Sequence, residues 1–169
     1  MAEADERDVE ALVLPISIRT AAGQGRTAMS AFDAALHGAG VSDFNLIRLS
    51  SVIPQASRIS FDSDPVVGDH GDKLYCVYAA AHAARPGETA WAGIGWVRDP
   101  SGNGLFVEHV AETEDSLLEL IHLSLEDMNE RRGGGYGPVE SATASVTAED
   151  RPACALAFAS YQVAGWDLG

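Results

Sequence analysis

Two adjacent serines, Ser50 and Ser51, follow a short, mainly apolar stretch at residues 46–49 and stand just before Val52 and Ile53. A serine hydroxyl that lies beside a backbone carbonyl in a strained turn can attack that carbonyl if a donor stabilises the oxyanion. An ester then replaces the peptide bond. Most serine pairs have no such chemistry, because their hydroxyls hold ordinary turns. The pair alone leaves both interpretations open.

The ester could break by β-elimination instead of hydrolysis. Position 51 would then become dehydroalanine and, after loss of ammonia, a pyruvoyl group, and the chain would be cut between Ser50 and Ser51. A ketone at that terminus can form an imine with an amino acid and accept the electrons that remain when carbon dioxide leaves. A protonated acid must then return a proton to the α-carbon.

The pattern around the serines resembles the pyruvoyl-dependent arginine decarboxylase family over most of the chain. The similarity rests on residues 23–27, 30–36, 38–40, 45–48 with the serine pair, 86–89 and 104–108, in that order. It implies cleavage into a β chain of residues 1–50 and an α chain of residues 51–169, which form one domain. It also implies a pyruvoyl group made from Ser51, without metal or pyridoxal phosphate, that converts L-arginine to agmatine and carbon dioxide through an imine.

The resemblance also assigns side chains. Glu108 matches the family's acid position, and an apolar strand around it would raise the pKa of its carboxyl group, although a glutamate on a strand is more often exposed. Asp33, on an expected helix, would bind the substrate guanidinium, or else be a helix-surface acid or pair with Arg26 or Arg48. Leu36 joins it as a substrate contact. Asn45 would orient the substrate or the scissile carbonyl, or simply hold a turn at the start of a strand.

Apolar periodicity predicts an α+β fold. We expect strands at residues 12–20, 73–84, 89–98, 105–111, 139–146 and 153–163, and a further strand that begins at Asn45 and ends before Ser50. Turns at residues 86–87 and 99–104 predict antiparallel hairpins. Thr27 or Ser30 can begin a helix that ends at residues 38–40, and residues 115–131 form the clearest helix. The family resemblance implies a four-layer αββα sandwich of mostly antiparallel sheets.

Alternating faces are expected along these strands. In the first strand, Ile16 and Ile18 should share one face and Ser17 and Arg19 the other. For the same reason His109 should point away from Glu108. A hydrolase triad of Ser51, His109 and an acid is therefore disfavoured, and no GxSxG motif surrounds either serine.

Composition narrows the class of protein. The chain has 169 residues, 46% of them hydrophobic, which is enough for one substantial core. A net charge of −14 argues against nucleic acid and favours a cationic small molecule. No apolar stretch is long enough to span a membrane, and the acidic N-terminus is unlike a signal peptide, so we expect a cytoplasmic protein. Cys76 and Cys154 lack ligand spacing and should be buried thiols on strands.

Two alternatives remain open at this stage. The chain could be a pyruvoyl decarboxylase for another amino acid, because residues 37–38 and 55–56 depart from the family pattern. It could also be an unprocessed relative that serves as a binding or structural oligomer. The resemblance implies a trimer, or a hexamer of paired trimers, with active sites between subunits.

Overall fold

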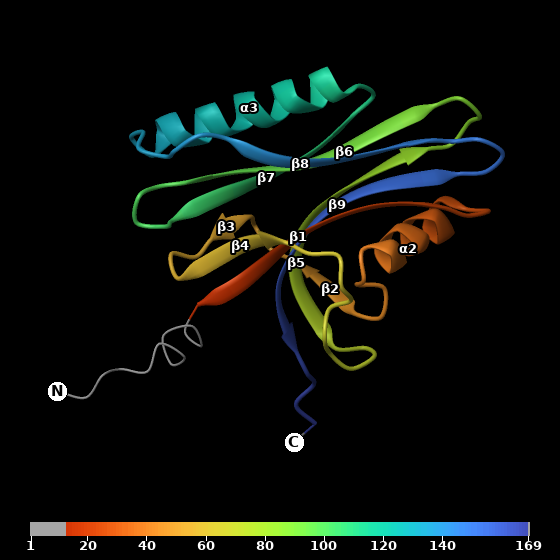
Figure 1. Ribbon diagram of the computed structural model, residues 1–169, viewed down its shortest axis with the longest axis horizontal. Helices are drawn as coiled ribbons and strands as arrows, with labels where there is room; N and C mark the ends of the chain where they lie inside the picture. The colour runs from red at the N-terminus through yellow and green to blue at the C-terminus, as the bar shows by residue number, and fades with distance from the viewer. Residues whose placement is uncertain (1–12, 169) are drawn as a thin grey trace.

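Nine strands and two helices make up the described part of the chain, residues 13–168 of the computed structural model (Figure 1). The helices are α2 (Ala28–Gly38) and α3 (Glu114–Arg131). The strands are β1 (Leu14–Gln24), β2 (Asn45–Arg48), β3 (Val52–Ile53), β4 (Ser57–Phe61), β5 (Lys73–Ala83), β6 (Thr89–Arg98), β7 (Gly104–Ala111), β8 (Glu140–Thr147) and β9 (Ala153–Ala164). Leu12, the first residue of the predicted first strand, lies outside the described residues.

The strands form two sheets. The five-stranded sheet has the order β2-β5-β9-β1-β4, and the four-stranded sheet has the order β3-β7-β6-β8. Two pairs in the larger sheet are parallel, β1 with β4 and β2 with β5, whereas every pair in the smaller sheet is antiparallel. The α+β prediction is therefore confirmed, and the larger sheet is mixed.

The two sheets pack face to face around an apolar core. Ile16 and Ile18 of the larger sheet meet Ile94 and Phe106 of the smaller one, and all four are buried. Helix α3 packs on the outer face of β6 and β7, and α2 packs on β1 and β9 (Figure 1). The predicted shared face of Ile16 and Ile18 thus faces the other sheet.

Helix α2 begins as the sequence predicts, and α3 begins one residue before its predicted start. Thr27 caps α2 and accepts a hydrogen bond from the backbone N–H of Ser30, whose hydroxyl in turn accepts one from the N–H of Thr27. Thr113 caps α3 in a similar way. Three leucine or isoleucine side chains of α3 are buried against the sheet, Leu117, Ile121 and Leu125.

Glycines allow the helices to approach the sheets closely. A Cβ on Gly23 would lie 2.4 Å from the backbone nitrogen of Ala35 in α2. A Cβ on Gly95 would lie 2.2 Å from Cγ2 of Ile121 in α3. Neither site can hold a larger residue without moving its helix.

One predicted hairpin is wrong. Strands β5 and β6 lie in different sheets, because both edges of β5 are already paired, with β2 and with β9. The connecting corner is held by Glu88, whose carboxylate accepts hydrogen bonds from the N–H groups of Ala84 and Arg85. The hairpin of β6 and β7 is confirmed.

Strand β4 was not expected, because it is only five residues long, mostly exposed, and has just two apolar residues, Ile59 and Phe61. Strand β1 also runs four residues beyond its predicted end, to Gln24. Cys76 and Cys154 are buried on β5 and β9, as predicted. Within residues 13–168, neither helix is long and apolar enough to cross a membrane.

Candidate active site

The chain crosses from one sheet to the other at the serine pair. Strand β2 ends at Arg48 in the five-stranded sheet, and the N–H of Leu49 still bonds the carbonyl of Cys76 there, at 2.9 Å. Strand β3 begins at Val52 in the four-stranded sheet, where the carbonyl of Ser51 accepts a hydrogen bond from the N–H of Phe106, at 2.8 Å. The peptide bond between Ser50 and Ser51 therefore connects two separately anchored segments.

Ser51 has a strained backbone. Its φ angle is +70°, and among the described residues it is the one non-glycine residue with positive φ. A side chain crowds the backbone in this region, so the conformation persists only where surrounding contacts enforce it. The strain sits at the residue that the sequence singles out for chemistry.

Glu108 holds the Ser51 hydroxyl. The Oγ atom of Ser51 donates a hydrogen bond of 2.5 Å to Oε1 of Glu108, which lies on β7. The Glu108 side chain is half-buried, and burial raises the pKa of its carboxyl group. The Ser51 hydrogen bond and the positive charge of Arg48 oppose that rise. Such a carboxyl group can stay protonated and donate at a pH where an exposed glutamate cannot.

Arg48 is an exposed residue whose positive charge acts on Glu108. Its guanidinium stacks on the ring of Tyr78 at 4.2 Å from the centroid, and it donates a hydrogen bond of 2.8 Å to the Tyr78 carbonyl. Cys76, on the neighbouring strand, is a buried thiol whose pKa burial raises to about 12. That thiol is therefore protonated and unreactive at neutral pH.

Tyr161 is a site residue that the sequence analysis missed. Its hydroxyl, on β9, donates a hydrogen bond of 3.0 Å to the carbonyl of Val52, the residue after Ser51. The ring is buried against Phe106, with 6.1 Å between centroids. Burial, and secondarily the negative charge of Glu108, raises the pKa of the Tyr161 phenol, so the group remains a donor. The available sequence signal for this residue was a single tyrosine in an otherwise alanine-rich strand.

Histidine chemistry is not part of this site. His109 Nε2 lies 2.7 Å from Oγ of Ser124 on α3, whereas Glu108 faces Ser51, so the predicted opposite orientation is confirmed. The Ser51–His109 triad is not formed. Among residues 13–168, no three histidine, cysteine, aspartate or glutamate side chains gather in a way that could hold a metal ion.

Within residues 13–168, none of the predicted substrate contacts is hydrogen-bonded to Ser51 or Glu108. Asp33 is exposed on α2, and among the described residues it forms no ion pair with Arg26 or Arg48. Leu36 is buried beneath α2 against the five-stranded sheet. The Asn45 amide donates a hydrogen bond of 2.8 Å to the carbonyl of Gly71, which is the turn-holding contact. Ser50 is exposed.

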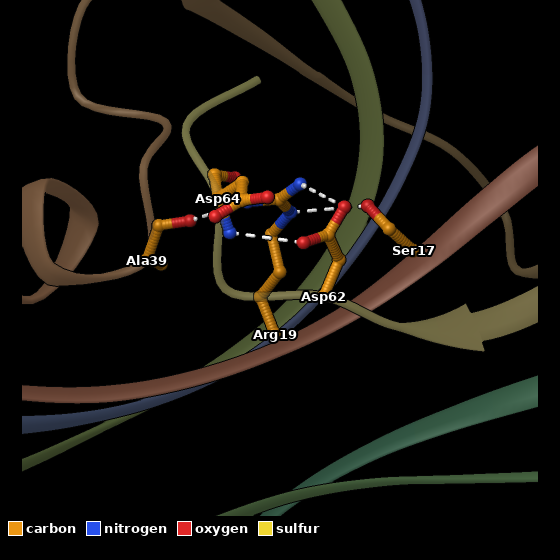
Figure 2. Close-up of polar contacts among 5 residues, drawn as sticks. All are labelled: Ser17, Arg19, Ala39, Asp62 and Asp64. Atoms are coloured by element: carbon orange, nitrogen blue, oxygen red, sulfur yellow. Dashed lines mark hydrogen bonds and ion pairs between the residues drawn. The ribbon is translucent and has the colours of Figure 1, made fainter.

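Helix α2 is fixed in place by a buried arginine, shown in Figure 2. Arg19 on β1 donates hydrogen bonds to the carbonyl of Ala39, at 3.0 Å, and to the carbonyl of Asp64, and its Nη2 lies 3.7 Å from a carboxylate oxygen of Asp62. Ser17 accepts a fourth contact, from Nε, at 3.0 Å. Arg19 thus connects the end of α2 to the loop after β4. Strand alternation predicted the face on which Arg19 lies but not its burial or these contacts.

A hollow of about 320 Å³ lies beyond the C-terminal end of α2, with His37, Phe44 and His70 on its wall. It includes neither Ser51 nor Glu108. Val52, next to Ser51, is a large apolar residue that is 57% exposed. Ser51 and Glu108 are themselves only partly buried, so the reactive pair lies near the surface of the single chain.

Comparison with known proteins gives one consistent result. The model of the family described as "Pyruvoyl-dependent arginine decarboxylase (PvlArgDC)" matches residues 16–163. A pyruvoyl-dependent arginine decarboxylase of Halobacterium salinarum is 36% identical over 150 residues, which cover 86% of this chain and 92% of that protein. Proteins of the same name from Thermococcus kodakarensis and Methanocaldococcus jannaschii are 34% and 31% identical, over 83% and 87% of this chain and 89% and 90% of theirs.

Proposed function

Because the chain belongs to the pyruvoyl-dependent arginine decarboxylase family, we propose that it cuts itself between Ser50 and Ser51 and uses the group formed from Ser51 to decarboxylate L-arginine. The products of the reaction are agmatine and carbon dioxide. The cleaved protein consists of residues 1–50 and residues 51–169. The observation that carries this proposal is the strained Ser51, whose hydroxyl is bound by a half-buried carboxyl group.

Self-cleavage follows from the chemistry of Ser51. Its Oγ attacks the carbonyl carbon of Ser50, the carbon–nitrogen bond breaks, and an ester links the two residues. Removal of the α-proton of residue 51 then expels the Ser50 carboxylate, and water releases ammonia from the remaining enamine to leave the ketone. Oε1 of Glu108 orients the hydroxyl for the first step, and relief of the positive φ angle favours it.

The residues around position 51 fit a pyruvoyl group. The N–H of Phe106 binds the Ser51 carbonyl, which becomes the amide oxygen of the group, and favours negative charge on that oxygen. When formed, the group supplies an electron sink for decarboxylation. Glu108 holds the proton that is returned to the α-carbon. Cleavage removes the Ser51 hydroxyl, one of the two influences that lower the Glu108 pKa, so the mature carboxyl group should be more readily protonated.

Arginine binding rests on Asp33. A carboxylate that is exposed on a helix can accept two parallel hydrogen bonds from a guanidinium. Leu36 and Asn45 are proposed to contact the rest of the substrate, as the family resemblance implies. The same resemblance implies a four-layer αββα arrangement of each subunit. Together with the exposed Val52 and Phe61, it also supports a trimer or hexamer in which a neighbouring subunit covers the open site.

An intact mass spectrum of the purified protein, recorded with and without borohydride, tests the proposal. We expect two chains, separated between Ser50 and Ser51. Borohydride should increase the mass of the larger chain by that of two hydrogen atoms, because it reduces the ketone to an alcohol. Release of carbon dioxide from arginine, but not from lysine or ornithine, would establish the substrate. A single uncut chain would contradict the proposal and favour an unprocessed binding protein.

A further inference from the structure

Tyr161 makes a contact that the proposed reaction does not use. Its hydroxyl reaches from β9 in one sheet to the Val52 carbonyl on β3 in the other, 109 residues away in sequence. The hydroxyl belongs to a residue that is only 7% exposed. Leaving a buried hydroxyl without a hydrogen-bond partner costs free energy. The Tyr161 hydroxyl therefore favours conformations in which the Val52 carbonyl stays within reach.

The Val52 carbonyl has no partner within the β-ladder of its own sheet. Ser51 and Phe106 form a hydrogen-bonded pair, so the next pair along the antiparallel ladder, Val52 with Leu105, is a non-hydrogen-bonded one. The N–H and carbonyl of Val52 therefore point away from β7. Strand β3 is at the edge of its sheet, so no further strand binds that carbonyl. Tyr161 supplies the missing donor from the opposite sheet.

We propose that Tyr161 is a positioning residue, which fixes the Val52 carbonyl and thereby keeps position 51 against Glu108 once the chain has been cut. Before cleavage, residue 51 is held from both sides, because residue 50 is covalently attached. After cleavage, residues 51–53 become a chain end with a strand of only two residues. Short chain ends fray unless they are tied down. The Phe106 N–H and the Tyr161 hydroxyl hold this end from opposite edges of β3.

This inference rests on the proposed function, since it concerns the cleaved chain. The test compares Tyr161→Phe with wild type and with Tyr75→Phe. Tyr75 packs against the same core cluster, and within residues 13–168 its hydroxyl forms no hydrogen bond, so it is a matched control. Both substitutions keep the ring. Each variant is assayed for cleavage by mass spectrometry, for carbonyl content, for kcat per carbonyl group and KM, and for amide hydrogen exchange at residues 51–56.

For Tyr161→Phe we expect near-complete cleavage, a fall of roughly five- to tenfold in kcat per carbonyl group with little change in KM, and faster exchange at the Ile53 amide. Tyr75→Phe should match wild type. If Tyr161→Phe matches wild type in kcat and exchange, the inference is wrong although the proposed function stands. If wild type itself is uncut, the proposed function fails instead.

A second background guards against a folding defect. In the uncleavable Ser51→Ala chain, residue 50 still holds residue 51, so adding Tyr161→Phe should change exchange at Ile53 much less than it does in the cleaved protein. An equal change in both backgrounds would show that Tyr161 only stabilises the fold, and would overturn the positioning proposal.

Discussion

The substitution Glu108→Gln separates the two reactions proposed for this site. Glutamine keeps an oxygen where Oε1 accepts the Ser51 hydrogen bond, so the hydroxyl remains oriented and self-cleavage should stay within about fivefold of wild type. Glutamine cannot, however, donate an acidic proton. Loss of a positioned general acid typically lowers turnover by about a hundredfold or more, which corresponds to about 2.7 kcal/mol of transition-state free energy.

The acid should also reveal itself in the pH profile. Burial raises the Glu108 pKa, so turnover should fall as pH rises through a value above the usual range for glutamate, because the donating form is lost. The folded chain binds this proton more tightly than the unfolded chain. Stability should therefore fall as pH rises from the ordinary glutamate pKa through the raised one, and Glu108→Gln should remove both trends.

Agmatine production per carbonyl group and thermal melts, each from about pH 4 to about pH 8, measure these effects. Glu112→Gln is a suitable control, since Glu112 is exposed just after the same strand. If Glu108→Gln turns over at the full wild-type rate once cleaved, another group supplies the proton, and the assignment of Glu108 is wrong. If cleavage itself is abolished, its carboxylate acts in processing as well.

Three further substitutions test other parts of the argument. Asp33→Asn should raise the KM for arginine roughly tenfold to a hundredfold in steady-state kinetics, because a charged hydrogen bond is lost, and it should leave cleavage intact; an unchanged KM would refute the guanidinium contact. Arg19→Met should lower the free energy of unfolding in urea by about 2–4 kcal/mol, because two carbonyls lose a buried donor, and Arg19→Lys should restore part of that loss. Equal stability of Arg19→Met and wild type would show that this connection is dispensable. Gly23→Ala should cost about 1–3 kcal/mol in the same assay because its Cβ would strike α2, whereas Gly165→Ala, whose Cβ has no atom nearer than 3.7 Å, is the control; equal losses would exclude the close approach as the cause.

Local signals in the sequence were sufficient for most elements. Apolar periodicity predicted the long strands and α3 to within a few residues, and the Thr27–Ser30 capping box predicted the start of α2. Such patterns depend on near neighbours in the chain. The parallel edge strand β4 is too short, with two apolar residues, to give a clear pattern. The sheet to which β6 belongs depends on which strands already occupy the edges of β5.

The site was predicted only where chemistry or resemblance marked a residue. Ser51 and Glu108 were both named from the sequence, and they lie in contact although 57 residues separate them. Tyr161 was missed because its partner is a backbone carbonyl, which carries no sequence signal, and two of the four contacts of Arg19 are of the same kind. The contributions of Asn45, Leu36 and Asp33 to substrate binding stay predictions.

The assignment of Asp33 and the expectation of an oligomer depend on each other. An exposed carboxylate gains little from pairing with a guanidinium, because water screens the interaction, and such pairs contribute about 0–1 kcal/mol. Selective binding of arginine therefore requires that something exclude water from Asp33, and no part of residues 13–168 covers it. A neighbouring subunit would do so. When the protein is diluted until the oligomer dissociates, as monitored by analytical ultracentrifugation, the KM for arginine should rise in parallel with the loss of oligomer. In Asp33→Asn the KM should no longer depend on protein concentration. A KM that stays constant while the oligomer dissociates would mean that arginine is recognised within one chain, by groups other than Asp33.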